Sequence, residues 1–504
     1  MKKQYKLLIV LMILICSCSK FLDRPLENQT NATGINYADL STMYQPVSGV
    51  YRTAAKANPG LVHWVDLGMR AVRGDEFDKG SSPGDQSPLA DIKSFSYGGL
   101  QAFWGLNNSW NDYYGLVIDC NSALLELNKF AKNIPSGDAK NTALYNQYSG
   151  EVRFIRAFAH LMASRVFGNV PVLTNNDSLT TVAKKSAADV RRFIISEMDA
   201  IIPNLEDARP NQSAHVGSVT KYSALLLKAK AAADLAGNDN GSSYWDAVID
   251  ATNQIISSSK FTLYSDFYQL FKMPGKLCNE SLFELQYTDF GDNTSSTVAP
   301  DAFWPFQGPG GDQKGSPISG WGFMPPTQKI VDFLTARNDL VRLKTTIQYC
   351  GVNGAPGTFV VTPSGDKVYG NSNGTKYFNG KAYLPANQMT ADRTDYGSNN
   401  NVRVLRYSDA LLLNAEAKVR KGQNGDASLN LVRSRAGLVP LSGASLQNIL
   451  DERRAEFACE WWGERFNDLL RTGQAAATLP NFVSGQSDYL PIPQSQIDLN
   501  PNLK

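Results

Sequence analysis

The densest group of residues that could do chemistry is the stretch ERRAEFACEWWGERF, residues 452–466. It holds four glutamates, and two carboxylates facing each other across a cleft are what a glycosidase needs. On a helix, however, Glu452, Glu456 and Glu460 follow one another at four-residue steps over roughly 12 Å, with arginines one turn away. We therefore interpret the stretch as a structural helix without catalytic residues. Its predicted apolar stripe is continuous and comprises Ala455, Cys459, Trp462, Phe466 and Leu469.

Motifs for other chemistry are absent from the sequence. There is no Gly-x-Ser-x-Gly elbow, no His-Glu-x-x-His and no phosphate loop. The net charge is +2 without a long basic run, which excludes a nucleic-acid-binding surface. Neither a metal site, a cofactor nor a disulfide framework is indicated, because the relevant side chains are scattered. These are His63, His160, His215, Cys120, Cys278, Cys350 and Cys459.

The N-terminus reads as a lipoprotein signal sequence. Lys2 and Lys3 precede the apolar run 7–16, which as a helix spans roughly 15 Å and is too short to cross a membrane. Ser17 is the small residue that lipoprotein processing requires before an acylated Cys18, although an ordinary cleaved signal is the alternative. We predict a signal peptide over 1–17, a lipidated Cys18 and a polar tether over 18–38, held on outer-membrane lipid by the acyl chains.

The elements that position the remaining residues are mainly helices. Three- and four-residue periodicity predicts helices in the region 39–271, over 39–56, 104–130, 141–167, 187–203, 217–236 and 243–257. In the region 401–504 it predicts helices over 405–421, 425–435 and 445–471. The segments YSALLLKAKA (222–231) and YSDALLLNAEA (407–417) resemble each other, which favours stacked helix pairs in both regions. Between them, the region 272–400 is rich in Gly, Asn, Asp, Ser and Pro, and contains an alternating strand at 281–287 and a helix at 326–334.

Several segments together resemble the SusD/RagB family of outer-membrane nutrient-binding lipoproteins. The segments are FLDRP (21–25), EVRFIRAFAHLMASRVFGNVPV (151–172), TKYSALLLKAKAAADLAG (220–237), LRYSDALLLNAEA (405–417), NLVRSRAGL (430–438), ERRAEFACEWWGERFNDLLRTG (452–473) and YLPIPQSQIDLNPNL (489–503). The resemblance implies a mostly α fold of tetratricopeptide-like helix pairs with an irregular loop-rich insert carrying short strands. It implies a non-enzymatic protein that captures oligosaccharides, or in some members peptides, and hands them to a SusC-like TonB-dependent porin.

Loop residues then become candidates for the ligand face. Aromatic rings can stack on the apolar faces of sugars, while Asp, Asn and Arg satisfy the hydroxyls. Two segments, 63–80 and 301–323, combine both kinds of residue, within an expected ligand face that includes the region 272–400. The predicted ligand-binding residues are Trp64, Arg73, Asp75, Phe77, Asp78, Trp304 and Trp321. By contrast, we expect Trp104, Trp110 and the 461–462 pair to be structural, because they lie on helical patterns.

Three alternatives remain open at this point. The chain could be a peptide-binding member of the same family, a lipid-anchored polysaccharide hydrolase, or a protein-only adaptor that uses helix repeats to assemble an envelope complex. Release of reducing ends would identify a hydrolase, and an adaptor would bind no small saccharide.

Overall fold

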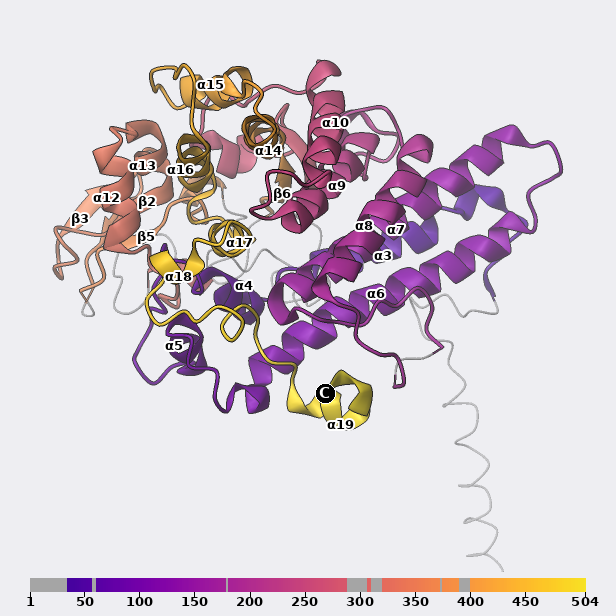
Figure 1. Cartoon of the computed structure of the whole chain (residues 1–504), viewed down its shortest axis with the longest axis horizontal. Helices are drawn as coiled ribbons and strands as arrows, with labels where there is room; N and C mark the ends of the chain where they lie inside the picture. Colours follow the sequence, from indigo (N-terminus) through magenta and orange to yellow (C-terminus); the bar gives the residue numbers. More distant parts are fainter. Residues whose placement is uncertain are drawn as a thin grey trace, which may run out of the picture.

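The computed structural model describes residues 34–56, 60–177, 180–287, 306–309, 320–371, 374–388 and 399–504. The described chain is mostly helical with three short two-stranded sheets, which confirms the predicted fold class. In Figure 1 the helices α6 (Trp104–Ala131), α7 (Ala139–Phe167) and α8 (Ala187–Ile201) form one end of the molecule. The other end is formed by α12 (Gln328–Ala336) and α13 (Leu340–Thr346), with β2 (Ile347–Tyr349), β3 (Phe359–Val361) and β5 (Tyr377–Asn379). Cys18 and Trp304 lie outside the described residues.

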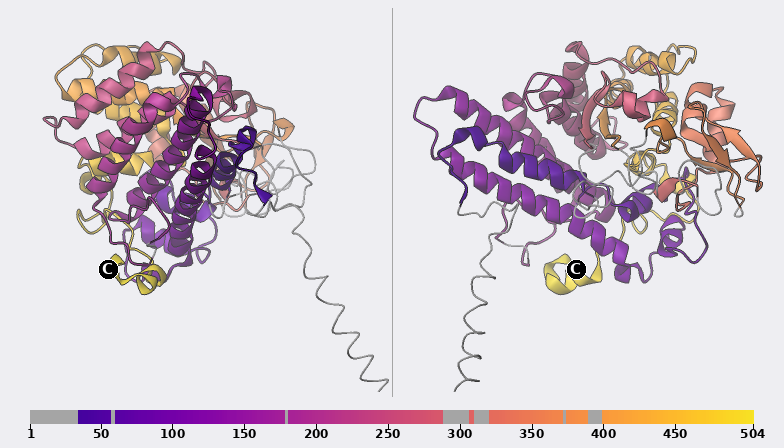
Figure 2. Two further views of the ribbon diagram at one scale, coloured as in Figure 1. Left: turned by 90° about the vertical axis from the view of Figure 1, so that its right-hand side faces the viewer. Right: turned by 180° about the vertical axis from the view of Figure 1, so that it is seen from behind.

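Helices in the first half of the chain pack against their sequence neighbours. The series α6–α7–α8–α9–α10 is continuous, and α3 contacts both α6 and α7 (Figures 1 and 2). Ser186 caps the N-terminus of α8, since its side chain accepts a hydrogen bond from the backbone N–H of Asp189 at 3.0 Å. The helices are α3 (Gln45–Ala55), α6 (Trp104–Ala131), α7 (Ala139–Phe167), α8 (Ala187–Ile201), α9 (Lys221–Ala236) and α10 (Tyr244–Ser257).

The two similar segments found in the sequence lie on α9 and α14 (Tyr407–Arg420), and both helices pack against α10. Their alanines are buried and allow the helix backbones to approach closely. α14 also packs against α15 (Asp426–Arg435) and α16 (Leu446–Phe457), so the helix stacking continues into the C-terminal region. The similarity therefore reflects one packing requirement met at two places.

The strands are short and pair only in twos. β1 (Ser281–Leu285) pairs antiparallel with β6 (Val402–Arg406), and the predicted alternation of buried and exposed residues in β1 is wrong, because all five residues are buried. Glu284 is tolerated there because Asn401 donates a hydrogen bond to its carboxylate at 2.8 Å. The insert adds α12 (Gln328–Ala336), α13 (Leu340–Thr346), β2 (Ile347–Tyr349) with β5 (Tyr377–Asn379), and β3 (Phe359–Val361) with β4 (Lys367–Tyr369).

The helix predicted over 445–471 is two helices. α16 ends at Phe457 and α17 (Glu464–Arg471) begins seven residues later, so the predicted stripe is not continuous. Cys459 and Gly463 adopt left-handed backbone conformations, with φ of 59° and 71°. The turn brings both indole N–H groups of Trp461 and Trp462 to one acceptor, the carbonyl of Arg403, at 3.0 and 2.7 Å. A helix would hold these adjacent rings about 100° apart, so burying both on one acceptor requires the break.

Part of the segment 63–80, expected as loop, is also helical. α4 (Trp64–Ala71) begins at the predicted ligand residue Trp64, and the short α5 (Pro88–Lys93) follows. The C-terminal segment carries α18 (Ala475–Thr478) and α19 (Gln494–Leu499). Within the described ranges, no helix has the length and apolarity that a membrane crossing would need.

Candidate functional site

The glutamates of residues 452–466 are buried ion-pair partners. Glu452 binds Arg342 and Arg433 at 2.6 and 2.9 Å, and Glu456 binds Arg406 at 2.9 Å. Both carboxylates are fully buried. Burial alone would raise the pKa of Glu456, but the surrounding guanidinium groups outweigh it and hold the pKa below the usual range. A carboxylate whose negative charge is compensated by arginines in this way stays ionised near neutral pH. It cannot exchange protons there, which agrees with a structural role.

Three tryptophans from separate parts of the chain form an aromatic surface instead. The ring centroid of Trp64 lies 5.5 Å from that of Trp104 and 5.6 Å from that of Trp321. Trp104 is 42% exposed and Trp321 is 38% exposed, while Trp64 is half-buried between them. Behind them, the buried rings of Phe306 and Phe323 stack at 4.9 Å. We call Trp64, Trp104 and Trp321 the tryptophan platform.

Backbone pairing brings the two predicted ligand segments together. Residues 76–81 run antiparallel to residues 322–327, with bridges between Phe77 and Pro326 and between Gly80 and Phe323. Hydrogen bonds from Asp78 N to the Pro325 carbonyl (2.9 Å) and from Thr327 N to the Glu76 carbonyl (2.8 Å) fix the register. A Cβ at Gly80 would lie 2.2 Å from the Gly322 carbonyl oxygen, so the close approach requires glycine. The platform is thus built on paired backbone and on the first residues of α4 and α6.

Arg73 and Asp75, two further predicted residues of the segment 63–80, face inward. The guanidinium of Arg73 lies 3.8 Å from the centre of the Phe466 ring and donates to the Ser487 carbonyl at 3.1 Å. Asp75 forms ion pairs with Arg465 and Arg454 at 2.8 and 3.1 Å. Burial alone would raise the pKa of Asp75, but these two arginines outweigh it and lower the pKa. These contacts fasten the segment to the C-terminal helices.

Phe77 and Asp78 differ in exposure. Phe77 is 2% exposed, so its ring belongs to the core beneath the platform segments. The carboxylate of Asp78 is more than half exposed and pairs with Lys93 at 3.1 Å. Among the predicted side chains that the structure describes, Trp64 and Trp321 are therefore in contact and Asp78 remains accessible, whereas Arg73, Asp75 and Phe77 make internal contacts.

Sequence reasoning missed Trp104 as a surface residue. Trp110 is 4% exposed, and Trp461 and Trp462 are each 5% exposed, in agreement with the structural role expected for them. Trp104 stands six residues before Trp110, a rotation that places it about 120° away around the helix. Trp110, Tyr114 and Val117 form the buried stripe of this helix, and Trp104 lies outside it. This position in the sequence pattern already indicated that the Trp104 ring does not face the same part of the core.

Two family models match separate parts of this chain. The family model described as "SusD family" matches residues 279–504, and one described as "Starch-binding associating with outer membrane" matches residues 101–233. The chain belongs to the SusD family. A SusD-like protein of Bacteroides ovatus is 24% identical over 477 residues, covering 92% of this chain and 81% of that protein.

Solved structures of SusD-family proteins share the fold. Surface glycan-binding protein A from Bacteroides thetaiotaomicron, in complex with laminarihexaose, is 25% identical with a TM-score of 0.73, covering 92% of this chain and 98% of that chain. A SusD homologue from Bacteroides thetaiotaomicron VPI-5482 is 18% identical with a TM-score of 0.77, covering 95% and 99%. The family assignment confirms the expectation that this SusD-family chain is not an enzyme.

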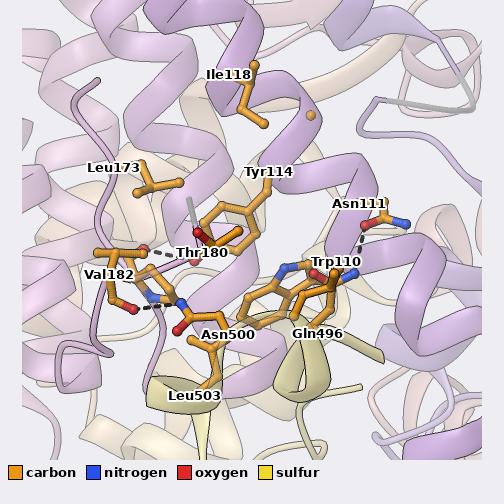
Figure 3. Close-up of a pocket in the computed structure, with 13 residues that line it drawn as sticks. Trp110, Asn111, Tyr114, Ile118, Leu173, Thr180, Val182, Gln496, Asn500 and Leu503 are labelled. Atoms are coloured by element: carbon orange, nitrogen blue, oxygen red, sulfur yellow. Dashed lines mark hydrogen bonds between the residues drawn. The ribbon is translucent and has the colours of Figure 1, made fainter. Parts of the chain in front are cut away.

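A hollow of about 280 Å³ in this SusD-family protein lies between α6, the C-terminal segment and four residues of the chain after α7, namely Pro171, Leu173, Thr180 and Val182 (Figure 3). Trp110 and Tyr114 line it, but both rings are almost fully covered and the Tyr114 hydroxyl donates to the Pro171 carbonyl at 2.8 Å. Asn500 and Gln496 on its rim are bonded to Val182 and Asn111. The hollow therefore offers a sugar no open ring face, unlike the tryptophan platform.

The described residues contain no group of three His, Cys, Asp or Glu side chains placed to hold a metal ion. The four cysteines in the described ranges form no disulfide with one another, and burial raises the pKa of Cys120 and Cys459 above the ordinary value. His160, buried in α7, donates from Nδ1 to the Arg156 carbonyl at 2.8 Å, and its Nε2 accepts a hydrogen bond from the Leu173 N–H at 3.0 Å. Together these side chains have structural contacts and assemble no further site.

Proposed function

We propose that this protein binds oligosaccharide at the cell surface on the tryptophan platform and passes it to a SusC-like TonB-dependent transporter. The observation that carries the proposal is the exposure of Trp104 and Trp321 at 42% and 38% on either side of Trp64. Large exposed aromatic rings are unfavourable in water unless a ligand covers them, and their faces match the apolar faces of pyranose rings. The laminarihexaose complex of a relative of similar fold supports a glycan as the ligand.

Within the predicted ligand set, the structure favours different roles for different residues. Trp64 and Trp321 provide ring faces, and the accessible carboxylate of Asp78 can accept hydrogen bonds from sugar hydroxyls. Arg73, Asp75 and Phe77 support the segment from within, through contacts with the C-terminal helices and the core. Trp304 lies outside the described residues and stays a predicted ligand contact.

The proposal includes membrane attachment through an acylated Cys18. A lipid anchor followed by the tether 18–38 would leave the helical body free to meet both the polysaccharide and a transporter. The match to a family model described as associating with the outer membrane supports this location.

The test is calorimetric titration with a panel of oligosaccharides that includes laminarihexaose, using the mature chain with Cys18→Ser. We expect Trp64→Ala and Trp321→Ala each to weaken binding about tenfold, because a lost aromatic stacking contact costs about 1 kcal/mol or more. The matched control is Phe359→Ala, whose ring is 43% exposed on β3, in the insert.

Trp321→Ala should melt within a few degrees of the wild type, because a large part of its ring is exposed. Trp64→Ala removes a half-buried ring that packs against Phe306, so its melting temperature is measured together with its affinity. Unchanged affinity in both variants, or equal loss in Phe359→Ala, would remove the platform as the glycan site. Failure of the wild type to bind any saccharide of the panel would reject glycan binding and direct attention to peptides.

A further inference from the structure

His63 lies directly beside the tryptophan platform. It precedes Trp64 at the start of α4, and its ring centroid is 6.2 Å from that of Trp64 and 6.3 Å from that of Trp104. The residue is 7% exposed, so most of the imidazole is enclosed by its neighbours. His63 therefore borders two of the rings that a ligand on the platform would cover.

One imidazole nitrogen of His63 is already committed to a buried carboxylate. Nδ1 lies 2.8 Å from Oδ2 of Asp112, a residue of α6 that is 1% exposed. The other oxygen, Oδ1, is buried without a hydrogen-bond partner in the described part of the chain. Burial raises the pKa of Asp112 to about 6, while the contact with His63 opposes the shift. The hydrogen bond with His63 therefore offsets part of the cost of burying the Asp112 carboxylate.

The neighbouring charged groups do not compete for His63. Asp66 pairs with Arg70 at 2.8 Å and accepts a hydrogen bond from the Tyr113 hydroxyl at 2.5 Å. With Asp112 holding Nδ1, the ring cannot turn over without losing its buried partner. Orientation of the imidazole is thus fixed by α6 and not by solvent.

The second nitrogen of His63 is left available. Nε2 has no hydrogen-bond partner among the described residues, and it is not among the polar atoms sealed from solvent. A proton held on Nδ1 by Asp112 makes Nε2 an acceptor for a hydroxyl group, and a second proton makes it a donor. In either state it offers directional polar recognition at the edge of the tryptophan platform, where the rings themselves offer only apolar faces.

We propose that His63 is the hydrogen-bonding residue of the platform, binding a hydroxyl of the saccharide through Nε2, and that Asp112 is the positioning residue that orients it. The inference rests on the proposed glycan-binding function and deepens it. It predicts a preference for saccharides that present a hydroxyl beside the stacked ring face. A saccharide without this hydroxyl would leave Nε2 of His63 covered and without a hydrogen bond, which costs affinity.

Two substitutions distinguish the contribution of Nδ1 of His63 from that of Nε2. In His63→Asn the amide reaches the position of Nδ1 and keeps the contact with Asp112, whereas in His63→Gln the longer side chain reaches the position of Nε2. We expect His63→Asn to bind laminarihexaose, or whichever panel saccharide the wild type binds, about five- to tenfold more weakly, the loss of one hydrogen bond. His63→Gln keeps a polar group at the position of Nε2 and should bind more tightly than His63→Asn, although it loses the contact with Asp112.

Asp112→Asn tests the positioning role. We expect it to weaken saccharide binding in the wild-type background and to have no further effect in the His63→Gln background, where the contact is already lost. Melting temperatures are measured for every variant, and His63→Gln keeps the test informative if Asp112→Asn is poorly folded.

The affinities of these variants distinguish a failure of the His63 proposal from a failure of the proposed glycan-binding function. Equal affinities of His63→Asn and wild type, or His63→Gln weaker than His63→Asn, would overturn the role of Nε2 while platform variants still weaken binding. Additive effects of Asp112→Asn and His63→Gln would overturn the positioning role. Failure of the wild type to bind any panel saccharide would instead reject the proposed function.

Discussion

Single residues in this protein are distinguished by what surrounds them more than by their type. Trp110, Trp245, Trp461 and Trp462 are at most 5% exposed, whereas Trp104 and Trp321 are 42% and 38% exposed. The buried indoles have internal partners: the N–H of Trp245, for example, donates to the Asp239 carbonyl at 2.9 Å. An exposed tryptophan next to other tryptophans, and not the tryptophan content, is therefore the local mark of the candidate site.

Glu151 on α7 supports a pH-dependent prediction at the residue scale. It is fully buried and accepts hydrogen bonds from Tyr51, Tyr44 and Gln147 at 2.9, 3.1 and 3.2 Å. Burial raises its pKa to about 7. The folded state therefore holds a proton that the unfolded state releases, and the free energy of unfolding falls as pH rises from about 4.5 to 7.

We expect Glu151→Gln to remove this dependence and to increase the free energy of unfolding at pH 8 by about 3 kcal/mol, measured by urea denaturation. Glu197→Gln is the control of opposite sign, because Arg153 and Arg156 lower the pKa of Glu197 against its burial. Destabilisation by Glu151→Gln at pH 8 would contradict the assignment.

At the scale of elements, buried ion pairs join parts of the chain that apolar packing alone would not align. Glu456 of α16 reaches Arg406 at the end of β6, Arg435 at the end of α15 and Arg342 of α13. Each partner is buried, so these charges must meet in one arrangement or remain uncompensated. The network fixes how the insert lies against the helical region.

The prediction at this scale is that Glu456→Gln lowers the free energy of unfolding by about 3–5 kcal/mol at pH 7, because it keeps the shape and leaves buried guanidinium groups without their counter-charge. Asp199→Asn is the control: its carboxylate is 53% exposed and pairs with Lys228 on the surface. Denaturant titration measures both, and a loss of under about 1 kcal/mol in Glu456→Gln would show that the network is not needed for stability.

For the whole molecule, the proposed role depends on attachment to the membrane through Cys18 and on binding of saccharide without cleavage. We expect Cys18→Ser to move the protein from the membrane fraction to the soluble fraction, since loss of acyl chains removes about 0.8 kcal/mol per buried methylene. Fractionation followed by immunoblotting measures this, with Cys120→Ser as the control because Cys120 is a buried thiol in α6. Continued membrane retention of Cys18→Ser would contradict the anchor.

Incubation of the Cys18→Ser protein with a polysaccharide panel should release no reducing ends, as expected for a binding protein. Copurification of the wild type with a large β-barrel partner would support the transporter role. Release of reducing ends that is abolished by changing a single acidic residue would overturn the binding-protein assignment.

The sequence by itself determined the helices with long apolar stripes, the helix stacking and the family, because these depend on local periodicity and on residue patterns that recur. It also identified the two segments that the backbone pairs beside Trp64 and Trp321. Only the tertiary structure decided that α16 and α17 are separate, that Arg73 and Asp75 face inward, that Trp104 belongs to the platform and that His63 lies beside it. These outcomes depend on partners far away in the chain, such as the Arg403 carbonyl for two indoles and Asp112 for one imidazole, and no local spacing encodes them.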